Sequence, residues 1–215
     1  MSAISSTAAT VQQQAYVNDT NYQDEWGIYA LGNEVFFLGV PDTGHDHSSY
    51  FGKAIPNVVA LGYDNFDVLI SNSTTKATVT GKMANATLYA SRSHGSFDAN
   101  GTYLWINSSQ WVHSLDLYNF STNMPVVDLS GCDIMLFIAC NTAKGENSLP
   151  QAAVNAGAKH AIGFNANIGC NKANSFLEKF FEQLLAGETV EQAGKNAAEA
   201  SFLSDQYCYF TSVNE

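Results

Sequence analysis

Two side chains in this sequence have the types and positions needed for nucleophilic catalysis. Cys140 ends the stretch LFIAC, and His94 lies in LYASRSHGS, so each follows an apolar run. A cysteine becomes a nucleophile near neutral pH when a base or a cation lies beside it, and a histidine in reach protonates the leaving group. Gly95, directly after the histidine, leaves a backbone N–H free to point at a carbonyl oxygen. Cys140, His94 and Gly95 are therefore the candidate catalytic residues, and the chemistry they predict is acyl transfer.

The elements around these residues alternate between strand-like and helix-like patterns, which is typical of a parallel sheet with crossover helices. We expect strands over residues 34–40, 66–70, 86–91, 133–139, 159–165 and 206–213. We expect helices over residues 50–61, 75–83, 147–157, 171–187 and 189–203. The predicted fold is an α/β three-layer sandwich with a mostly parallel central sheet flanked by helices.

The predicted sheet brings the candidate residues together, because the carboxyl ends of parallel strands share one edge of a sheet. The run DIMLFIA before Cys140 is apolar enough to be buried on both faces as a central strand. Aromatic, β-prone segments predict a β-rich insertion over about 96–128. We interpret residues 1–33 as an N-terminal extension and 34–215 as the main domain. Ser148 and Thr189 each begin a helix in a capping-box pattern.

Composition excludes several classes of function. The 215 residues suit one domain with a proper core, since 46% of them are hydrophobic. A net charge of -11 with only 9 Lys and Arg provides no basic surface for nucleic acid or anionic lipid. No apolar stretch is long enough to cross a bilayer, and the first residues lack the segments of a signal peptide. The oligomeric state is not indicated by the sequence.

The cysteines are scattered, which argues against both a metal knuckle and a disulfide framework. We expect no cofactor and no metal. N-x-S/T triplets occur at Asn18, Asn72, Asn85, Asn100, Asn107 and Asn119. They favour an extracellular or cell-surface protein carrying glycans. An Asn-, Ser- and Thr-rich chain also produces such triplets by chance, so the cytoplasm stays the alternative.

At this point the sequence resembles the caspase-like (clan CD) cysteine peptidases, nearest to clostripain-like and CHAT-type domains. LYASRSHGS is similar to their strand ending in His-Gly, and DIMLFIACNTA to their strand ending in a cysteine after a small residue. AAVNAGAKHAIGFN is similar to their helix-to-strand step. The histidine of caspases precedes the cysteine by about 50 residues, and the separation here is similar. The resemblance covers roughly residues 34–213 and implies the caspase-haemoglobinase fold.

The resemblance also implies roles for particular residues. His94 would be the catalytic histidine and Cys140 the nucleophile, and the backbone N–H groups of Gly95 and Cys140 would form the oxyanion hole. The chain departs from the family in two places. Ile138 stands where clostripain-like members often carry an aspartate that selects basic side chains, and the caspase QAC-G signature is absent.

The loop PDTGHDHSSY after the first strand must emerge at the same edge and reach the substrate. We expect Asp46 and then Asp42 to bind a basic residue before the scissile bond, with Asn165 and Asn167 framing the same pocket. A carboxylate there favours Lys or Arg, whereas amides alone favour a small polar residue. His45 and His47 with Asp46 are an alternative metal site that lacks a further ligand.

Two hypotheses from different classes follow. The first, which the resemblance implies, is a cysteine endopeptidase that uses a Cys-His dyad and has a protein or peptide substrate as its partner. The second is a catalytically silent surface or interaction module that binds through the aromatic insertion TYLWINSSQWVHSLDLYNF. A flavodoxin-like or nucleotide-binding domain is excluded, because no Gly-rich phosphate loop follows the first strand.

Overall fold

The computed structural model describes residues 34–40, 51–70 and 74–212, and the central feature of this part is a six-stranded sheet. Its strands are β1 (Glu34–Gly39), β2 (Asn65–Ile70), β3 (Leu88–Arg92), β9 (Ile134–Ile138), β10 (His160–Phe164) and β11 (Tyr207–Thr211). They lie in the order β11-β10-β9-β3-β1-β2, and all pairs are parallel except β10 with β11. The mostly parallel sheet predicted from the alternating patterns is confirmed.

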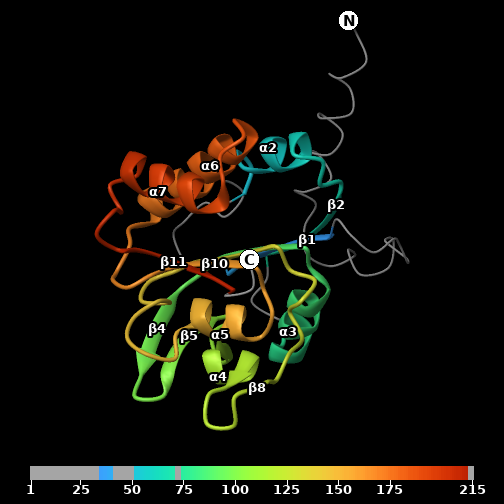
Figure 1. Ribbon diagram of the computed structural model, residues 1–215, viewed down its shortest axis with the longest axis vertical. Coiled ribbons are helices and arrows are strands. Elements are labelled where there is room, and N and C mark those ends of the chain that lie inside the picture. Colours follow the sequence, from blue (N-terminus) through green and yellow to red (C-terminus); the bar gives the residue numbers. More distant parts are fainter. Residues whose placement is uncertain (1–33, 41–50, 71–73, 213–215) are drawn as a thin grey trace, which may run out of the picture.

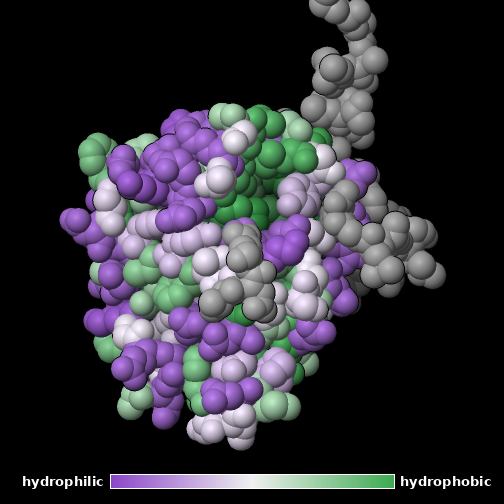
Figure 2. Space-filling view, in the orientation of Figure 1, coloured by the Kyte–Doolittle hydropathy of each residue, from purple (hydrophilic) through white to green (hydrophobic). Residues whose placement is uncertain are grey.

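Helices cover both faces of this sheet (Figure 1). One layer contains α2 (Ile55–Ala60), α6 (Cys170–Leu185) and α7 (Val190–Ala200). The other contains α3 (Lys76–Asn85), α4 (Ser114–Leu117) and α5 (Leu149–Asn155). In the face drawn in Figure 2, hydrophilic residues cover α6 and α7, and hydrophobic residues gather beside α2. The predicted three-layer α/β sandwich is thus the observed architecture.

Strand β9 shows why the sequence forms a buried central strand. All five residues of IMLFI are buried, and their side chains alternate between the two layers. Leu136 and Ile138 join the core beneath α6 and α7, whereas Met135 and Phe137 join the core on the other face. Burying such side chains contributes about 1.5–3 kcal/mol each before entropy is subtracted. The buried strand therefore holds the turn after Ile138 in a fixed position.

Helix starts differ from the sequence expectations in two ways. The helix expected over 50–61 begins only at Ile55, because Pro56 occupies its first turn, where a missing N–H costs nothing. The hydroxyls of Ser148 and Thr189 accept from the N–H groups three residues on, as predicted. The other bond of each predicted capping box, from the N-cap backbone N–H to the glutamine side chain, is wrong. Gln151 and Gln192 donate instead to Asn155 and Asn196, one turn along their helices.

The segment after β3 forms a small subdomain of short strands. It contains β4 (Gly95–Asp98), β5 (Gly101–Trp105), β6 (Trp111–His113), α4, β7 (Tyr118–Asn119) and β8 (Met124–Pro125). Strands β4, β5 and β6 make an antiparallel three-stranded sheet, and β7 pairs with β8. The segment expected as a β-rich insertion thus also holds a helical turn, α4.

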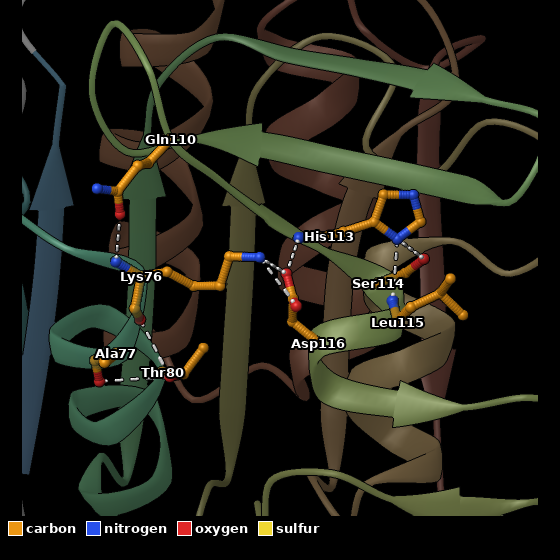
Figure 3. Close-up of polar contacts among 8 residues, drawn as sticks. All are labelled: Lys76, Ala77, Thr80, Gln110, His113, Ser114, Leu115 and Asp116. Atoms are coloured by element: carbon orange, nitrogen blue, oxygen red, sulfur yellow. Dashed lines mark hydrogen bonds and ion pairs between the residues drawn. The ribbon is translucent and has the colours of Figure 1, made fainter.

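Polar contacts fasten this subdomain to α3 (Figure 3). The Lys76 ammonium lies 2.9 Å from an Asp116 carboxylate oxygen, and the Lys76 backbone N–H donates to the Gln110 side chain at 3.0 Å. Asp116 also accepts from the His113 N–H at 2.8 Å, while the His113 ring accepts from the Leu115 N–H at 3.0 Å. His113 is therefore the N-cap of α4, and the small sheet is held in place.

Candidate active site

The register of β3 and β9 brings the candidate residues to one level. Arg92 and Ile138 are direct partners at the carboxyl ends of these adjacent parallel strands. His94 and Cys140 each follow two residues later, one in the turn into β4 and one in the turn after β9. The edge that the sequence predicted for both residues is therefore the edge where the structure has them.

Gly95 makes the closest link between the two turns. A Cβ atom at this position would lie 2.3 Å from the carbonyl oxygen of Cys140 and 3.1 Å from the Cβ of Ala139. Real Cβ atoms do not approach a backbone carbonyl so closely, so only glycine fits. The backbone that follows His94 thus packs directly on the backbone of Cys140.

The sulfur of Cys140 faces the loop between β10 and α6. The Ile168 N–H donates to Sγ at 3.3 Å, and Sγ lies 3.6 Å from the Ile168 carbonyl oxygen. The side chain is partly exposed, so it combines a backbone donor with access to solvent. A nucleophilic cysteine must be accessible so that the substrate can reach its sulfur.

The turn after Cys140 is fixed by hydrogen bonds. The buried Thr142 hydroxyl lies 3.0 Å from the Phe137 carbonyl oxygen and accepts from the Phe164 N–H at 3.2 Å. Asn141 adopts a left-handed conformation with φ of 59°, and its amide donates to Asn167 at 2.8 Å. Asparagine tolerates this conformation better than most residues. The carboxyl end of β9 is thereby tied to that of β10.

His94 is exposed, whereas Cys140 is half-buried. The backbone carbonyl of His94 accepts from the Trp105 N–H at 2.9 Å, so the start of the β4–β5 hairpin holds the turn. The imidazole therefore lies on the solvent side of the sheet edge. A group that protonates a departing amine must be reachable in this way.

Arg92 is a residue of the site that sequence reasoning missed. Its side chain is only 6% exposed, and it donates to Asn174 at 2.9 Å and to the Cys170 carbonyl at 3.4 Å. It therefore joins the end of β3 to the start of α6, next to the loop that contacts the Cys140 sulfur. The signal in the sequence was a single charge at the end of an apolar strand, two residues before the histidine.

A pocket of about 410 Å³ adjoins the loop that holds the sulfur. Its lining residues are Asn167, Gly169, Cys170, Asn171, Lys172, Leu203 and Gln206. The predicted pocket residue Asn167 thus lines it, while Asn165 lies beside it and bonds through its N–H to the Gln206 carbonyl at 2.9 Å. The other predicted recognition residues, Asp42 and Asp46 with His45 and His47, lie outside the described residues.

A comparison with protein families shows to which family the chain belongs. The sequence model of the CHAT domain matches residues 34–208, which is most of the chain. The chain belongs to the CHAT domain family. This confirms the resemblance drawn from the His-Gly and cysteine strands.

Several solved structures are similar in fold to this CHAT domain. Gingipain R, described as an Arg-specific cysteine proteinase, matches with a TM-score of 0.63 and 12% identity over 96% of this chain and 51% of its own. A complex of the Porphyromonas gingivalis RgpB pro- and mature domains gives a TM-score of 0.61 and 13% identity, covering 85% and 47%. The separase-securin complex of Saccharomyces cerevisiae gives 0.55 and 12%, covering 84% and 12%. These matches establish the caspase-haemoglobinase fold, and no curated protein matches.

The other thiols of this CHAT domain have different surroundings. Burial raises the pKa of the Cys132 thiol to about 12, and burial also raises the pKa of Cys208. Cys170 is partly exposed at the first turn of α6. Within the described ranges, no three His, Cys, Asp or Glu side chains gather as a metal would need. None of the described helices is long and apolar enough to cross a bilayer.

Proposed function

We propose that this CHAT domain is a cysteine endopeptidase, a hydrolase that cleaves peptide bonds with Cys140 as nucleophile and His94 as its histidine partner. The observation that carries the proposal is the contact of Gly95 with the Cys140 backbone. It brings a histidine turn and a cysteine turn together at the carboxyl edge of a parallel sheet, where active sites of such sheets lie.

In the proposed reaction, the Cys140 thiolate attacks the carbonyl carbon of the scissile peptide bond. The carbonyl oxygen becomes an oxyanion, and His94 gives a proton to the departing amine as the C–N bond breaks. A thioester then joins the acyl part of the substrate to Cys140. Water attacks this thioester with His94 as base, which releases the carboxylic acid and restores the thiol.

Two backbone N–H groups are suited to hold the oxyanion. The hydrogen bond between Trp105 and His94 sets the pattern of the β4–β5 ladder, so the next residue, Gly95, turns its N–H away from β5. The N–H of Cys140 has no acceptor among the residues that the structure describes. Donors of this kind contribute about 3–4 kcal/mol each to an oxyanion in acyl-transfer enzymes.

For specificity, we propose that a basic residue precedes the scissile bond, with Asp46 and then Asp42 as its carboxylate partners and Asn165 and Asn167 in the pocket wall. The carboxylates are essential to this proposal, because the described pocket lining contains amides and one lysine but no carboxylate. Asp46→Asn should lower turnover of Lys and Arg substrates about tenfold or more, the value of a lost charge-assisted hydrogen bond. A cleavage profile dominated by small polar residues would assign the pocket to its amides alone.

The function is tested by covalent labelling with a peptidyl acyloxymethyl ketone. Mass spectrometry of the digested protein should find the label on Cys140, and Cys140→Ala should remove it. Cys170→Ser is the matched control, since its thiol is also partly exposed, at the first turn of α6. Equal labelling of Cys140→Ala and wild type would overturn the assignment of the nucleophile.

A second candidate is a catalytically silent interaction module. It is favoured by the aromatic row Tyr103, Trp105 and Trp111 on the small sheet, where neighbouring ring centroids lie 5.8 and 6.1 Å apart and Trp111 is 42% exposed. Failure to cleave any member of a peptide library, together with unlabelled Cys140, would favour this module.

For the location of the protein, we propose that it is extracellular or at the cell surface. Glycan mapping of the secreted chain tests it.

A further inference from the structure

One edge of strand β4 is open in the part of the chain that the structure describes. Strand β4 is the outer strand of the β4-β5-β6 sheet among the described residues. It begins at Gly95, inside the candidate active site, and runs along the margin of the molecule (Figure 1). Phe97 and Asp98 are exposed. An edge of this kind accepts an extended peptide as an additional strand.

The ladder fixes which groups are available. The Trp105 N–H donates to the His94 carbonyl, so hydrogen-bonded pairs alternate from that point and Ser96 bonds to Tyr103. Gly95 and Phe97 occupy the non-hydrogen-bonded positions of this ladder. The N–H and the C=O of each of these two residues therefore point away from β5. No described residue bonds to these groups. The nearest free groups beyond the Gly95 N–H are thus the Gly95 carbonyl and the Phe97 N–H.

The location of the edge selects the half of the substrate that it binds. The predicted pocket for the residue before the scissile bond lies at the β10–α6 loop, on the β10 flank of β9. Strand β4 continues from β3, on the opposite flank of β9. His94, which would protonate the departing amine, immediately precedes β4. The substrate half released as the amine therefore extends toward β4.

We propose that the substrate residues after the scissile bond pair with the free edge of β4 as a parallel strand. This inference rests on the proposed peptidase function and adds its leaving-group binding site. In parallel pairing, one residue bonds to the two neighbours of its partner. The Gly95 N–H then holds the scissile carbonyl, and the Gly95 carbonyl accepts the N–H of the second residue after the bond. The Phe97 N–H donates to the carbonyl of that same second residue.

This ladder distinguishes neighbouring amides of the substrate. The N–H of the second residue after the scissile bond faces β4, whereas the N–H of the third faces away. Replacing an amide by an ester removes the N–H and keeps the shape. A peptide that wild type cleaves is therefore made in three forms: all-amide, with the ester at the second residue, and with the ester at the third.

The ester at the second residue should lower kcat/KM about tenfold, as expected for one lost hydrogen bond. The ester at the third residue should leave kcat/KM within twofold. Binding to Cys140→Ala, measured by fluorescence anisotropy, should show the same order without turnover. Equal effects of the two esters would overturn the inference while cleavage continues. A second copy of the chain that occupies the β4 edge in place of the substrate would overturn it as well. A wild type that neither cleaves peptides nor labels at Cys140 would instead refute the peptidase function itself.

Discussion

Strand β9 has a cysteine beyond each end, and the two thiols have opposite surroundings. Cys132, before the strand, is fully buried, and its sulfur lies 3.5 Å from the Thr87 carbonyl oxygen and 3.4 Å from the Ile134 carbonyl oxygen. Cys140, after the strand, is partly exposed and receives an N–H from Ile168. Burial disfavours a thiolate at Cys132, because a charge without solvent is costly, whereas Cys140 can be reached by solvent and substrate. The same strand thus carries an inert thiol at its amino end and a candidate nucleophile at its carboxyl end.

The difference follows from the geometry of a parallel sheet. At the carboxyl end of β9, the chain turns away and the neighbouring loops diverge, which leaves room for a substrate. At the amino end, Asp133 and Ile134 both bond through their N–H groups to the Thr87 carbonyl, and the core closes over the cysteine. Position in the fold, more than the residue type, separates a reactive cysteine from a structural one.

The largest expected effect comes from removing His94, the proposed partner of Cys140. His94→Ala should lower turnover by about 100-fold or more, because general acid–base catalysis is worth that much. The side chain is exposed, so the thermal unfolding midpoint should change little. Peptide cleavage and differential scanning calorimetry measure both quantities. Loss of the unfolding transition in His94→Ala would show that His94 is a structural residue. Cys140 would then lack its proposed partner, and the contrast between Cys140 and Cys132 would lose its basis.

Gly95→Ala should have the next largest effect. The added Cβ would clash with the Cys140 carbonyl, so the two turns must separate. We expect labelling of Cys140 by the acyloxymethyl ketone to slow by about tenfold or more, together with a lower unfolding midpoint. Gly131→Ala is the matched control, because nothing lies within 4 Å of a Cβ at that exposed position. Similar behaviour of the two variants would show that the contact does not hold the site.

The sequence predicted the strands of the sheet well because buried parallel strands appear as continuous apolar runs. DIMLFIA needs no knowledge of its neighbours to be recognised, and the His94 and Cys140 positions followed from the ends of such runs. The family resemblance then implied the roles of these residues. These features are local, so one sequence contains them.

Contacts between distant segments could not be predicted in this way. Arg92 bonds to Asn174, 82 residues further along the chain, and no local pattern links the two. The contact of Gly95 with Cys140 depends on the register of β3 and β9, which apolar runs alone do not fix. Asp42 and Asp46 lie outside the described residues, so their role in specificity stays a prediction.

Thr142→Val should have a smaller effect, confined to the carboxyl end of β9. Valine has the same shape but leaves the buried Phe164 N–H without its hydroxyl acceptor. This should lower the free energy of unfolding by about 1–3 kcal/mol and slow labelling of Cys140. Thr122→Val, at an exposed position, should change stability by less than about 0.5 kcal/mol. Urea unfolding compares the two variants, and equal stability would mean that the Thr142 hydroxyl does not fix the turn.

The smallest effect concerns the inert thiol and appears only at alkaline pH. Burial raises the pKa of Cys132 to about 12, above its ordinary value of 9.0, so an unfolded chain loses this proton at lower pH than the folded one. Stability should therefore decrease as pH rises above about 9, by about 1 kcal/mol between pH 9 and pH 10. Cys132→Ala should unfold more easily at pH 7, because it loses buried atoms, but its free energy of unfolding should have a shallower slope above pH 9. Equal slopes for the two proteins, measured by urea unfolding at each pH, would mean that Cys132 ionises as easily in the folded state as in the unfolded chain. The contrast between the two ends of β9 would then disappear.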